Sequence, residues 1–518
     1  MDQRHKGGAI LASLILTPVF IWFVTAKTVY GFTPQTVRSV LPELFKGTFS
    51  GGSYLWPLKL AGGVGLALGL AIAVAIVVFS KQVFAGASFS RFYRGTQLVT
   101  QRSLARKTKE AIPQVTIADV PIPYEAETTH IQVAGTTGTG KSTLFNEIIL
   151  GAMKRGDRQI ILDPDGSYLK KFWRKGDKIL NPYDARSEAW SFFNEIREDY
   201  DFERYAESMI QVSSDQGSEE WNEYGRLLFR EVAKKLYRTQ HNPTIAQVFE
   251  WTNERPVNEL AEFCQGTRAV SLFTGNDRAT GSTRFILSKA LAPHLNMPHG
   301  KFSLRNWLED PEGGNLFITW TEEQRAALTP SLSAWTDTII SSILAMPEDE
   351  SRRVWLYLDE LESLNRLPSL GPGLTKGRKK GLRIVCGYQN YTQVEHVYGP
   401  KQAETMVNNM RTIVALATGR MGTSTAEMVA KSLGEHEIER HRSSRSHKLG
   451  ELGTRSDRDD LKLERIVLPS ELSRLPNLQG YLSFPGDLPI AKIKYKPIEF
   501  KRAAPVPAFV SRHQAFAS

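Results

Sequence analysis

The chain has 518 residues, of which 41% are hydrophobic, 10% aromatic and 23% charged. This composition excludes an intrinsically disordered protein, and the length indicates two or three domains. The formal net charge of +10 favours acidic partners such as nucleic acid or anionic lipid headgroups. The two cysteines, Cys264 and Cys386, are far apart and in no metal-ligand spacing, so neither a disulfide framework nor a zinc site is indicated.

Two long uncharged runs near the N-terminus each predict a helix that crosses a membrane. The first is GGAILASLILTPVFIWFVTA at residues 7–26, and the second is LAGGVGLALGLAIAVAIVVFS at residues 60–80. A span needs about 20 apolar residues. We therefore expect a transmembrane anchor over residues 1–82, with spans at about 7–28 and 60–80. The alternatives are a cleaved signal peptide for the first run and a buried core helix for the second.

The flanks of these runs predict their orientation. Basic residues concentrate after the second run, and the loop between the runs carries fewer, which places the chain after residue 80 in the cytoplasm. Both termini are then cytoplasmic. The second run also contains small residues that would let another helix approach closely. These residues are Gly62, Gly63, Gly65 and Gly69.

A phosphate-binding loop follows a short apolar strand at HIQVAG. The loop GTTGTGKS matches the pattern G-x-x-x-x-G-K-[ST], and STLFNEIILGAMKRG after it predicts a helix. Backbone N–H groups in such a loop point at phosphate oxygens. Lys141 is expected to pair with the β- and γ-phosphates of ATP, and the Ser142 hydroxyl to ligate Mg²⁺. The expected nucleotide-binding residues are Gly135, Thr136, Thr137, Gly138, Thr139, Gly140, Lys141, Ser142 and Thr143.

An acidic pair follows a second buried strand in RRVWLYLDELESL. Val354 to Leu358 is a continuous apolar run, and Asp359 and Glu360 come directly after it. Asp359 is expected to hold Mg²⁺ through water, and Glu360 to polarise the attacking water as general base. The alternative is a solvated acidic turn at the end of a strand. Paired with the upstream loop, the two carboxylates favour a site that hydrolyses ATP.

Further short apolar runs predict strands of the same sheet, covered by helices on both faces. They begin at Arg158, Asn315, Leu382 and Thr412. Ligands in such sheets bind beyond the carboxyl ends of the strands. Asp163, Asp359 and Gln389 follow or end such strands, so we expect them to border the nucleotide. Gln389 either senses the γ-phosphate or caps a turn, and the residues leave both interpretations open.

The strand pattern stops between about residues 188 and 300, where two segments predict amphipathic helices. Trp221 lies roughly on the apolar stripe of the second helix with Leu228, Val232 and Leu236. Helix core is the favoured interpretation of Trp221, and a base-stacking side chain is the alternative.

Three features are predicted in the last eighty residues. The segment from Glu439, ERHRSSRSHKLGELGTRSDRDDLKLER, is dense in charges of both signs and predicts a mobile surface loop. GYLSFPGDLPIAKIKY predicts a hairpin that turns at Gly486 and Asp487. Residues 503–518 have no periodicity and predict a disordered tail.

The order of these motifs resembles one family. Two membrane spans precede GTTGTGKST and IILDPDGSY, a helical insertion follows, and YLDELESL and GRKKGLRIVCGYQN come after it. This combination resembles the type IV secretion coupling proteins, the TraD/TrwB-like ATPases of bacterial conjugation. The resemblance implies an α/β fold with a RecA-like P-loop domain at residues 83–187 and 301–502. An all-α domain at 188–300 and the two-helix anchor complete it.

The resemblance also implies a function. Members form hexamers on the bacterial inner membrane, recruit the relaxase with its DNA, and help to drive single-stranded DNA into the type IV secretion channel. Double-stranded DNA is a further partner that the resemblance leaves open. Gln389 matches the glutamine motif of the family. Arg378, among the basic residues of TKGRKKGLR, is the candidate arginine that reaches a neighbouring subunit's nucleotide. A solvated basic turn is the alternative.

Two other functions stay open at this point. One is a coupling receptor for protein effectors without a DNA substrate, and the basic charge alone tilts against it. The other is an FtsK-like double-stranded DNA translocase. That class usually carries a larger membrane region and a terminal DNA-reading domain, neither of which is visible in this sequence.

Overall fold

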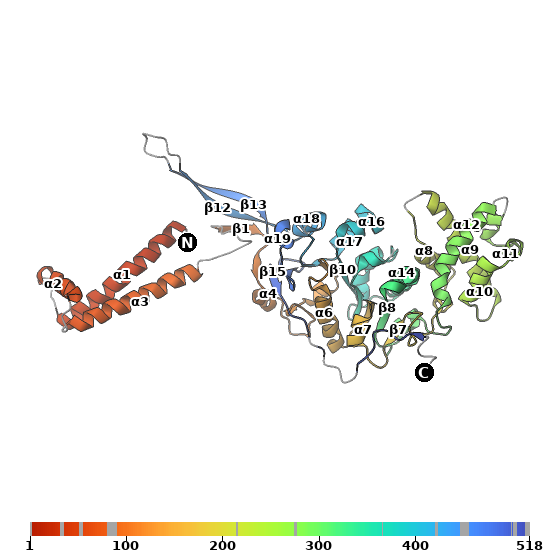
Figure 1. Ribbon diagram of the computed structural model, residues 1–518, viewed down its shortest axis with the longest axis horizontal. Coiled ribbons are helices and arrows are strands. Elements are labelled where there is room, and N and C mark those ends of the chain that lie inside the picture. Colours follow the sequence, from red (N-terminus) through yellow and green to blue (C-terminus); the bar gives the residue numbers. More distant parts are fainter. Residues whose placement is uncertain are drawn as a thin grey trace. The chain divides into compact units, whose positions relative to one another are not determined.

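The structure is a computed structural model, and it describes most of the chain (Figure 1). The residues outside the description are 1–2, 32–35, 51–54, 80–90, 214–215, 274–276, 365, 420–422, 446–454, 499, 501–504 and 513–518. The chain forms two compact units. The first contains residues 1–95 and 435–466, and the second contains residues 96–434 and 467–518.

The first unit begins with two long apolar helices, α1 (Gln3–Tyr30) and α3 (Trp56–Phe79). By length and composition, Leu11–Tyr30 and Trp56–Val74 could each cross a membrane, with mean hydropathies of 1.6 and 1.8. Few of the side chains in these two stretches are buried, and many are exposed, including Leu16 and Phe20. Apolar side chains that no protein covers are what a lipid-facing helix presents.

Helices α1 and α3 pack closely against each other, as the small residues of the second run predicted. A Cβ added at Gly65 would lie 2.6 Å from Cα of Pro18, and one at Gly69 would lie 2.5 Å from the carbonyl oxygen of Ser13. A Cβ at Gly62 or Gly63 would meet nothing within 4 Å. Two of the four glycines therefore permit the contact and the other two do not take part in it.

A third helix, α2 (Val37–Phe49), lies between them in sequence and was not predicted. Trp22 of α1 donates from Nε1 to Oγ1 of Thr48 over 3.1 Å, and its ring meets Phe45 edge-on at 5.7 Å between centroids. Leu55 and Leu58 bury their side chains in the same cluster. Helix α2 is thus packed onto α1.

The first unit ends in a three-stranded antiparallel sheet in the order β1-β12-β13. Its strands are β1 (Arg91–Gly95), β12 (Glu435–Arg445) and β13 (Arg455–Arg465). The prediction of a mobile loop from Glu439 is therefore wrong for the described part of that segment. The β12–β13 ladder runs from Glu435 opposite Arg465 to Arg445 opposite Arg455. Main-chain hydrogen bonds build such a ladder, and they need no apolar alternation that a sequence pattern could reveal.

The second unit is built on a ten-stranded mixed sheet in the order β2-β15-β14-β11-β5-β10-β9-β6-β8-β7. Neighbouring strands are parallel from β11 to β7, β14 is antiparallel to both of its neighbours, and β2 is parallel to β15. The bounds are β2 (Leu98–Thr100), β5 (Ile131–Ala134), β6 (Arg158–Pro164), β7 (Lys178–Leu180), β8 (Leu316–Trp320), β9 (Val354–Leu358), β10 (Leu382–Tyr388), β11 (Thr412–Ala415), β14 (Gln479–Ser483) and β15 (Ile490–Lys494).

Every residue of β5, β8, β9, β10 and β11 is buried, as expected for strands covered on both faces. The α/β fold and the predicted strands are confirmed, and β14 and β15 form the predicted hairpin. The flanking helices are α4 (Gln101–Lys107), α5 (Tyr124–Glu127), α6 (Lys141–Arg155), α7 (Ser167–Phe172), α13 (Leu304–Glu309), α14 (Glu322–Ala345), α15 (Leu370–Lys376), α16 (Tyr391–Tyr398), α17 (Pro400–Asn409), α18 (Thr423–Ser432) and α19 (Pro469–Leu472). A two-stranded sheet of β3 (Thr116–Ile117) and β4 (Val120–Pro121) precedes α5.

The segment from α8 to α12, between β7 and α13, is mostly helical and forms its own cluster in the second unit (Figure 1). Its helices are α8 (Tyr200–Met209), α9 (Gln216–Thr239), α10 (Ile245–Phe249), α11 (Val257–Phe263) and α12 (Asp277–Leu295). Leu228, Val232 and Leu236 of α9 are fully buried. Trp221 is half-buried and its ring lies edge-on to that of Tyr224, so it packs at the margin of this core.

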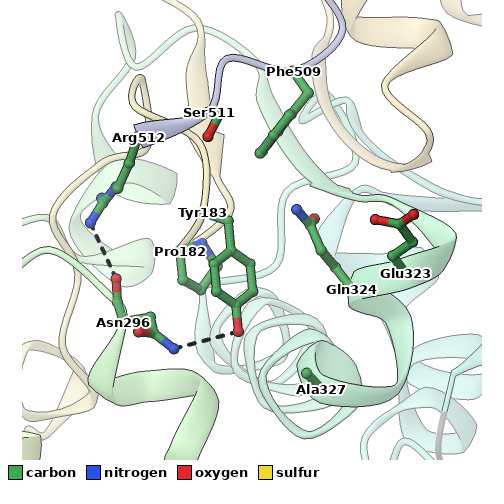
Figure 2. Close-up of a pocket in the computed structure, with 9 residues that line it drawn as sticks. All are labelled: Pro182, Tyr183, Asn296, Glu323, Gln324, Ala327, Phe509, Ser511 and Arg512. Atoms are coloured by element: carbon green, nitrogen blue, oxygen red, sulfur yellow. Dashed lines mark hydrogen bonds between the residues drawn. The ribbon is translucent and has the colours of Figure 1, made fainter. Parts of the chain in front are cut away.

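The C-terminal residues 505–512 lie along the loop after β7, so the prediction of a disordered tail is wrong for this part of 503–518. Ala185 donates its backbone N–H to the carbonyl of Val510 over 2.8 Å, and Nη1 of Arg186 donates to the carbonyl of Pro507 over 2.9 Å. Main-chain hydrogen bonds again order a segment without apolar periodicity. Figure 2 shows Arg512 at the rim of a cavity of about 640 Å³, donating to the carbonyl of Asn296.

Candidate active site

The phosphate loop connects β5 to α6. Gly138 and Gly140 adopt φ angles of +79° and +110°, a backbone region that glycine enters without strain. A Cβ at Gly140 would also lie 2.6 Å from Oη of Tyr495. Two hydrogen bonds fix the start of the loop: Gly135 N–H to the carbonyl of Tyr388 over 3.2 Å, and Thr136 N–H to the carbonyl of Ala417 over 2.9 Å.

The loop leaves donors free for a ligand. Among the described residues, the N–H groups of Gly138, Gly140 and Lys141 have no hydrogen-bond partner. Lys141 opens α6, a helix of fifteen residues, so the positive end of the helix dipole lies at the same place. Thr139 instead uses its hydroxyl within the loop, donating to the carbonyl of Thr136 over 2.7 Å. This is an arrangement that binds phosphate oxygens.

Asp359 lies directly after β9 and faces the loop. Oγ of Ser142 donates to Oδ2 of Asp359 over 3.2 Å. The other oxygen, Oδ1, is buried and has no partner among the described residues. A hydroxyl and a carboxylate with a free oxygen, next to a phosphate-binding loop, fit the ligand preference of Mg²⁺. The residues present therefore fit a magnesium nucleotide.

Gln389, after β10, links the loop to Glu360. Thr137 donates from Oγ1 to Oε1 of Gln389 over 2.8 Å, and Nε2 of Gln389 donates to Oε1 of Glu360 over 3.1 Å. The backbone N–H of Gln389 donates to Oε1 of Glu362 over 2.7 Å. The side chain thus bridges two functional groups, and its Nε2 is not used as a turn cap.

Glu362 was not singled out from the sequence, because a third acidic residue in DELE gives no pattern of its own. Burial raises the pKa of its carboxyl, which the hydrogen bonds from backbone N–H groups partly oppose. Glu360, Glu362 and Gln389 line a cavity of about 570 Å³ that also contacts Arg325 and His396. A water molecule could reach Glu360 from this cavity.

Asp163 lies near the carboxyl end of β6. Its side chain is fully buried and accepts the N–H groups of Tyr168 over 3.0 Å and Leu169 over 2.6 Å. Burial raises the pKa of Asp163 to about 7, and the Asp359 charge adds to this shift. Asp163 thus anchors the first turn of α7, and that it also borders the nucleotide stays a prediction.

Tyr168, which α7 carries, is a site residue that the sequence did not reveal. Its hydroxyl donates to Oδ2 of Asp359 over 2.5 Å. Burial and the charge of Asp359 raise the pKa of Tyr168 well above its ordinary value, so the hydroxyl keeps its proton. The only sequence signal was its place in DPDGSY, five residues after Asp163.

Arg378 lies far from the loop within the same chain. It belongs to a short helix, Gly377–Lys380, directly before β10. Because β10 is parallel to β5, the residues before β10 lie at the opposite edge of the sheet from the loop that follows β5. Arg378 is exposed, and its side chain has no hydrogen bond or ion pair among the described residues. The structure does not bring it together with the other predicted site residues.

Comparison with known proteins gives consistent matches. Residues 114–496 match the sequence model of the type IV secretion-system coupling protein DNA-binding domain. The coupling protein TraD of Escherichia coli (strain K12) is 31% identical over 409 residues, which are 76% of this chain and 56% of TraD. The chain thus spans little more than half of that relative.

Two solved structures of the coupling protein TrwB align over nearly their whole length. The unbound monoclinic form of TrwBdeltaN70 is 48% identical, covers 83% of this chain and 99% of that chain, and has a TM-score of 0.77. TrwB in complex with ADP and Mg²⁺ is 47% identical with the same coverage and a TM-score of 0.76.

Proposed function

The chain belongs to the type IV secretion-system coupling proteins, and we propose that it is a membrane-anchored ATPase that drives relaxase-bound single-stranded DNA into a type IV secretion channel. The observation that carries the ATPase part is the contact of Ser142 with Asp359 beside the unpaired N–H groups of the loop. The TrwB structure with ADP and Mg²⁺ supports the choice of nucleotide.

Each residue of the site has a role in this proposal. The loop N–H groups and the ammonium of Lys141 would hold the β- and γ-phosphates. Ser142 and Asp359 would hold Mg²⁺, which supplies further neutralisation of the phosphate charge. Glu360 would take a proton from the attacking water. Gln389 would orient Glu360 and, through Thr137, connect it to the loop that senses the phosphates.

The proposed assembly is a homo-hexamer. Arg378 is exposed at the edge of the sheet opposite the phosphate loop. A guanidinium there could serve the nucleotide of a neighbouring subunit, because it is out of reach of its own. Supplying this positive charge in trans would couple hydrolysis between neighbours.

The proposed location is the bacterial inner membrane, with two spans at about residues 7–28 and 60–80 and both termini in the cytoplasm. The two apolar helices α1 and α3 support the spans. The basic residues that follow the second run support the orientation. We divide the chain into the anchor 1–82, the nucleotide-binding domain 83–187 with 301–502, and the all-α domain 188–300.

DNA is the proposed cargo, with the relaxase and the channel proteins as protein partners. The family model that matches is described as a DNA-binding domain, and the net charge of +10 agrees with an acidic partner. A receptor for protein effectors and a double-stranded DNA translocase are the two competing functions. The effector receptor would bind no DNA, and the double-stranded DNA translocase would prefer duplex to single strands.

Fluorescence anisotropy of labelled DNA tests this choice. The full-length Glu360→Gln variant in detergent, with ATP, is titrated into single-stranded and double-stranded DNA of equal length at several salt concentrations. The proposal predicts binding to single strands that weakens as salt rises. A clear preference for duplex would favour the double-stranded translocase. Absence of binding to either DNA at moderate salt, in protein that binds ATP, would favour the effector receptor.

A further inference from the structure

Tyr168 is held rigidly beside the acidic end of β9. Its side chain is 1% exposed, and its ring packs against that of Phe145 with 6.4 Å between the centroids. Full burial in a close-packed interior restricts the rotation of the ring. The hydroxyl therefore has a fixed position.

The backbone of Tyr168 is fixed as well. Asp163 accepts the N–H groups of Tyr168 and Leu169. The turn before α7 contains Gly166 at φ +64°, where an added Cβ would lie 2.5 Å from the carbonyl oxygen of Ala508. The C-terminal residues thus lie directly against the turn that carries Tyr168. The Tyr168 end of the contact with Asp359 is therefore held by the surrounding fold.

The two carboxylate oxygens of Asp359 differ in their hydrogen bonds. Oδ2 accepts from the hydroxyls of Tyr168 and Ser142, whereas Oδ1 is buried without a partner among the described residues. A carboxylate held at one oxygen cannot turn about its Cβ–Cγ bond without losing that hydrogen bond. The free oxygen then keeps one direction.

We propose that Tyr168 is a positioning residue for the metal site: its hydroxyl holds Oδ2 of Asp359 so that Oδ1 is presented to the divalent cation that accompanies the nucleotide. This inference rests on the proposed ATPase function and adds the side chain that sets the geometry of its metal ligand. Groups that orient a metal ligand typically change metal affinity by about 10- to 100-fold when removed.

The hydroxyl of Tyr168 is not there merely because a buried tyrosine needs a partner. Tyr357 lies two residues before Asp359, is fully buried in the same aromatic cluster, and its Oη has no partner among the described residues. The fold therefore tolerates an unpaired tyrosine hydroxyl at this depth. Tyr357 is also a matched control, because Tyr357→Phe removes the same atom from the same cluster.

The test is binding of a fluorescent ADP analogue to the full-length protein in detergent, with EDTA and over a magnesium titration. Tyr168→Phe is expected to leave the Kd in EDTA close to the wild-type value and to raise the magnesium concentration at half-saturation by about tenfold or more. Tyr357→Phe is expected to change neither quantity. An unchanged magnesium dependence in Tyr168→Phe would overturn the inference, as would an equal shift in Tyr357→Phe.

A second variant separates positioning from loss of fold. Asp359→Asn should itself weaken magnesium binding, so adding Tyr168→Phe to it should have little further effect. Additive losses in the double variant would contradict the inference, because they would mean that Tyr168 acts apart from Asp359. Wild-type protein that binds no nucleotide in any condition would instead contradict the proposed function itself.

Discussion

The side-chain amide of Gln389 joins the phosphate loop to the candidate general base, since its Nε2 lies 3.1 Å from Oε1 of Glu360. Its Oε1 accepts from Thr137 of the loop over 2.8 Å. A phosphate that enters the loop and breaks the hydrogen bond between Thr137 and Gln389 would therefore change the position of the Glu360 carboxylate. This is a direct route from nucleotide binding to the position of the base.

Gln389→Ala should lower kcat for ATP without weakening ADP binding. Glu360 would lose the hydrogen bond that orients it. A general base contributes roughly a hundredfold or more to the rate, and we expect the loss of its orientation to lower kcat by about tenfold or more. Steady-state turnover and ADP binding measure the two quantities. Gln393→Ala, which removes an exposed amide lining the same cavity, is the control. A large loss of ADP affinity in Gln389→Ala would contradict this role.

Arg378→Ala should reduce turnover only in assembled protein, because Arg378 lies at the sheet edge opposite its own phosphate loop. Mixing it with Lys141→Ala subunits should restore part of the activity, since each intact loop can then meet an intact arginine. Turnover across mixing ratios measures this. Lys376→Ala removes another exposed positive charge nearby and should behave as wild type. Absence of rescue would leave Arg378 without a role in trans.

Gly65→Leu should separate the two apolar helices, whereas Gly63→Leu should not. The first substitution would place Cβ 2.6 Å from Cα of Pro18, and the second meets open space. Overpacking of this kind costs about 1–3 kcal/mol. Disulfide formation between cysteines introduced at Ala26 and Leu58, which share a buried cluster, reports the packing. Equal cross-linking rates in both variants would show that this packing is absent in the membrane.

Stability should fall on acidification because of His294. Burial lowers the pKa of this ring from 6.5 to about 4. The unfolded state therefore takes up the proton first, so the stabilisation is complete above pH 6.5 and is lost as pH falls towards 4. At about 1.4 kcal/mol per pH unit, the loss between pH 6.5 and 5 is about 2 kcal/mol.

Denaturant unfolding at pH 7 and pH 5 measures this contribution. His294→Gln removes the titrating group and should show a smaller difference in the free energy of unfolding between the two pH values. The exposed His241 serves as control, so His241→Gln should keep the wild-type difference. If His294→Gln also kept it, another group would be responsible.

The sequence was most informative where one residue type is required at one position. Gly138 and Gly140 of the phosphate loop adopt positive φ angles, and the acidic pair follows a buried strand, so the loop and Asp359 could be located by pattern alone. In these cases the conformation depends on residues that are neighbours in the sequence. The run of small residues from Gly62 to Gly69 predicted a close helix contact, but only the structure shows that Gly65 and Gly69 make it.

Contacts between distant segments could not be predicted. The β12–β13 ladder and the C-terminal segment depend on backbone hydrogen bonds, which any residue but proline can donate. The role of Tyr168 depends on the position of Asp359, 191 residues later. Asp163 and Asp359 both lie near the carboxyl end of a strand. The carboxylate of Asp163, however, accepts hydrogen bonds from the first turn of α7. Only the tertiary arrangement separates these two aspartates.

ATP turnover of the full-length protein in detergent tests the central claim most directly. It is measured across protein concentrations with single-stranded DNA, double-stranded DNA or none, and Lys141→Ala gives the blank. We predict turnover that rises steeply with protein concentration and with single-stranded DNA, as expected of an assembling, DNA-responsive motor. Turnover that ignores DNA at every concentration and at moderate salt would contradict the DNA motor and favour a receptor for protein cargo.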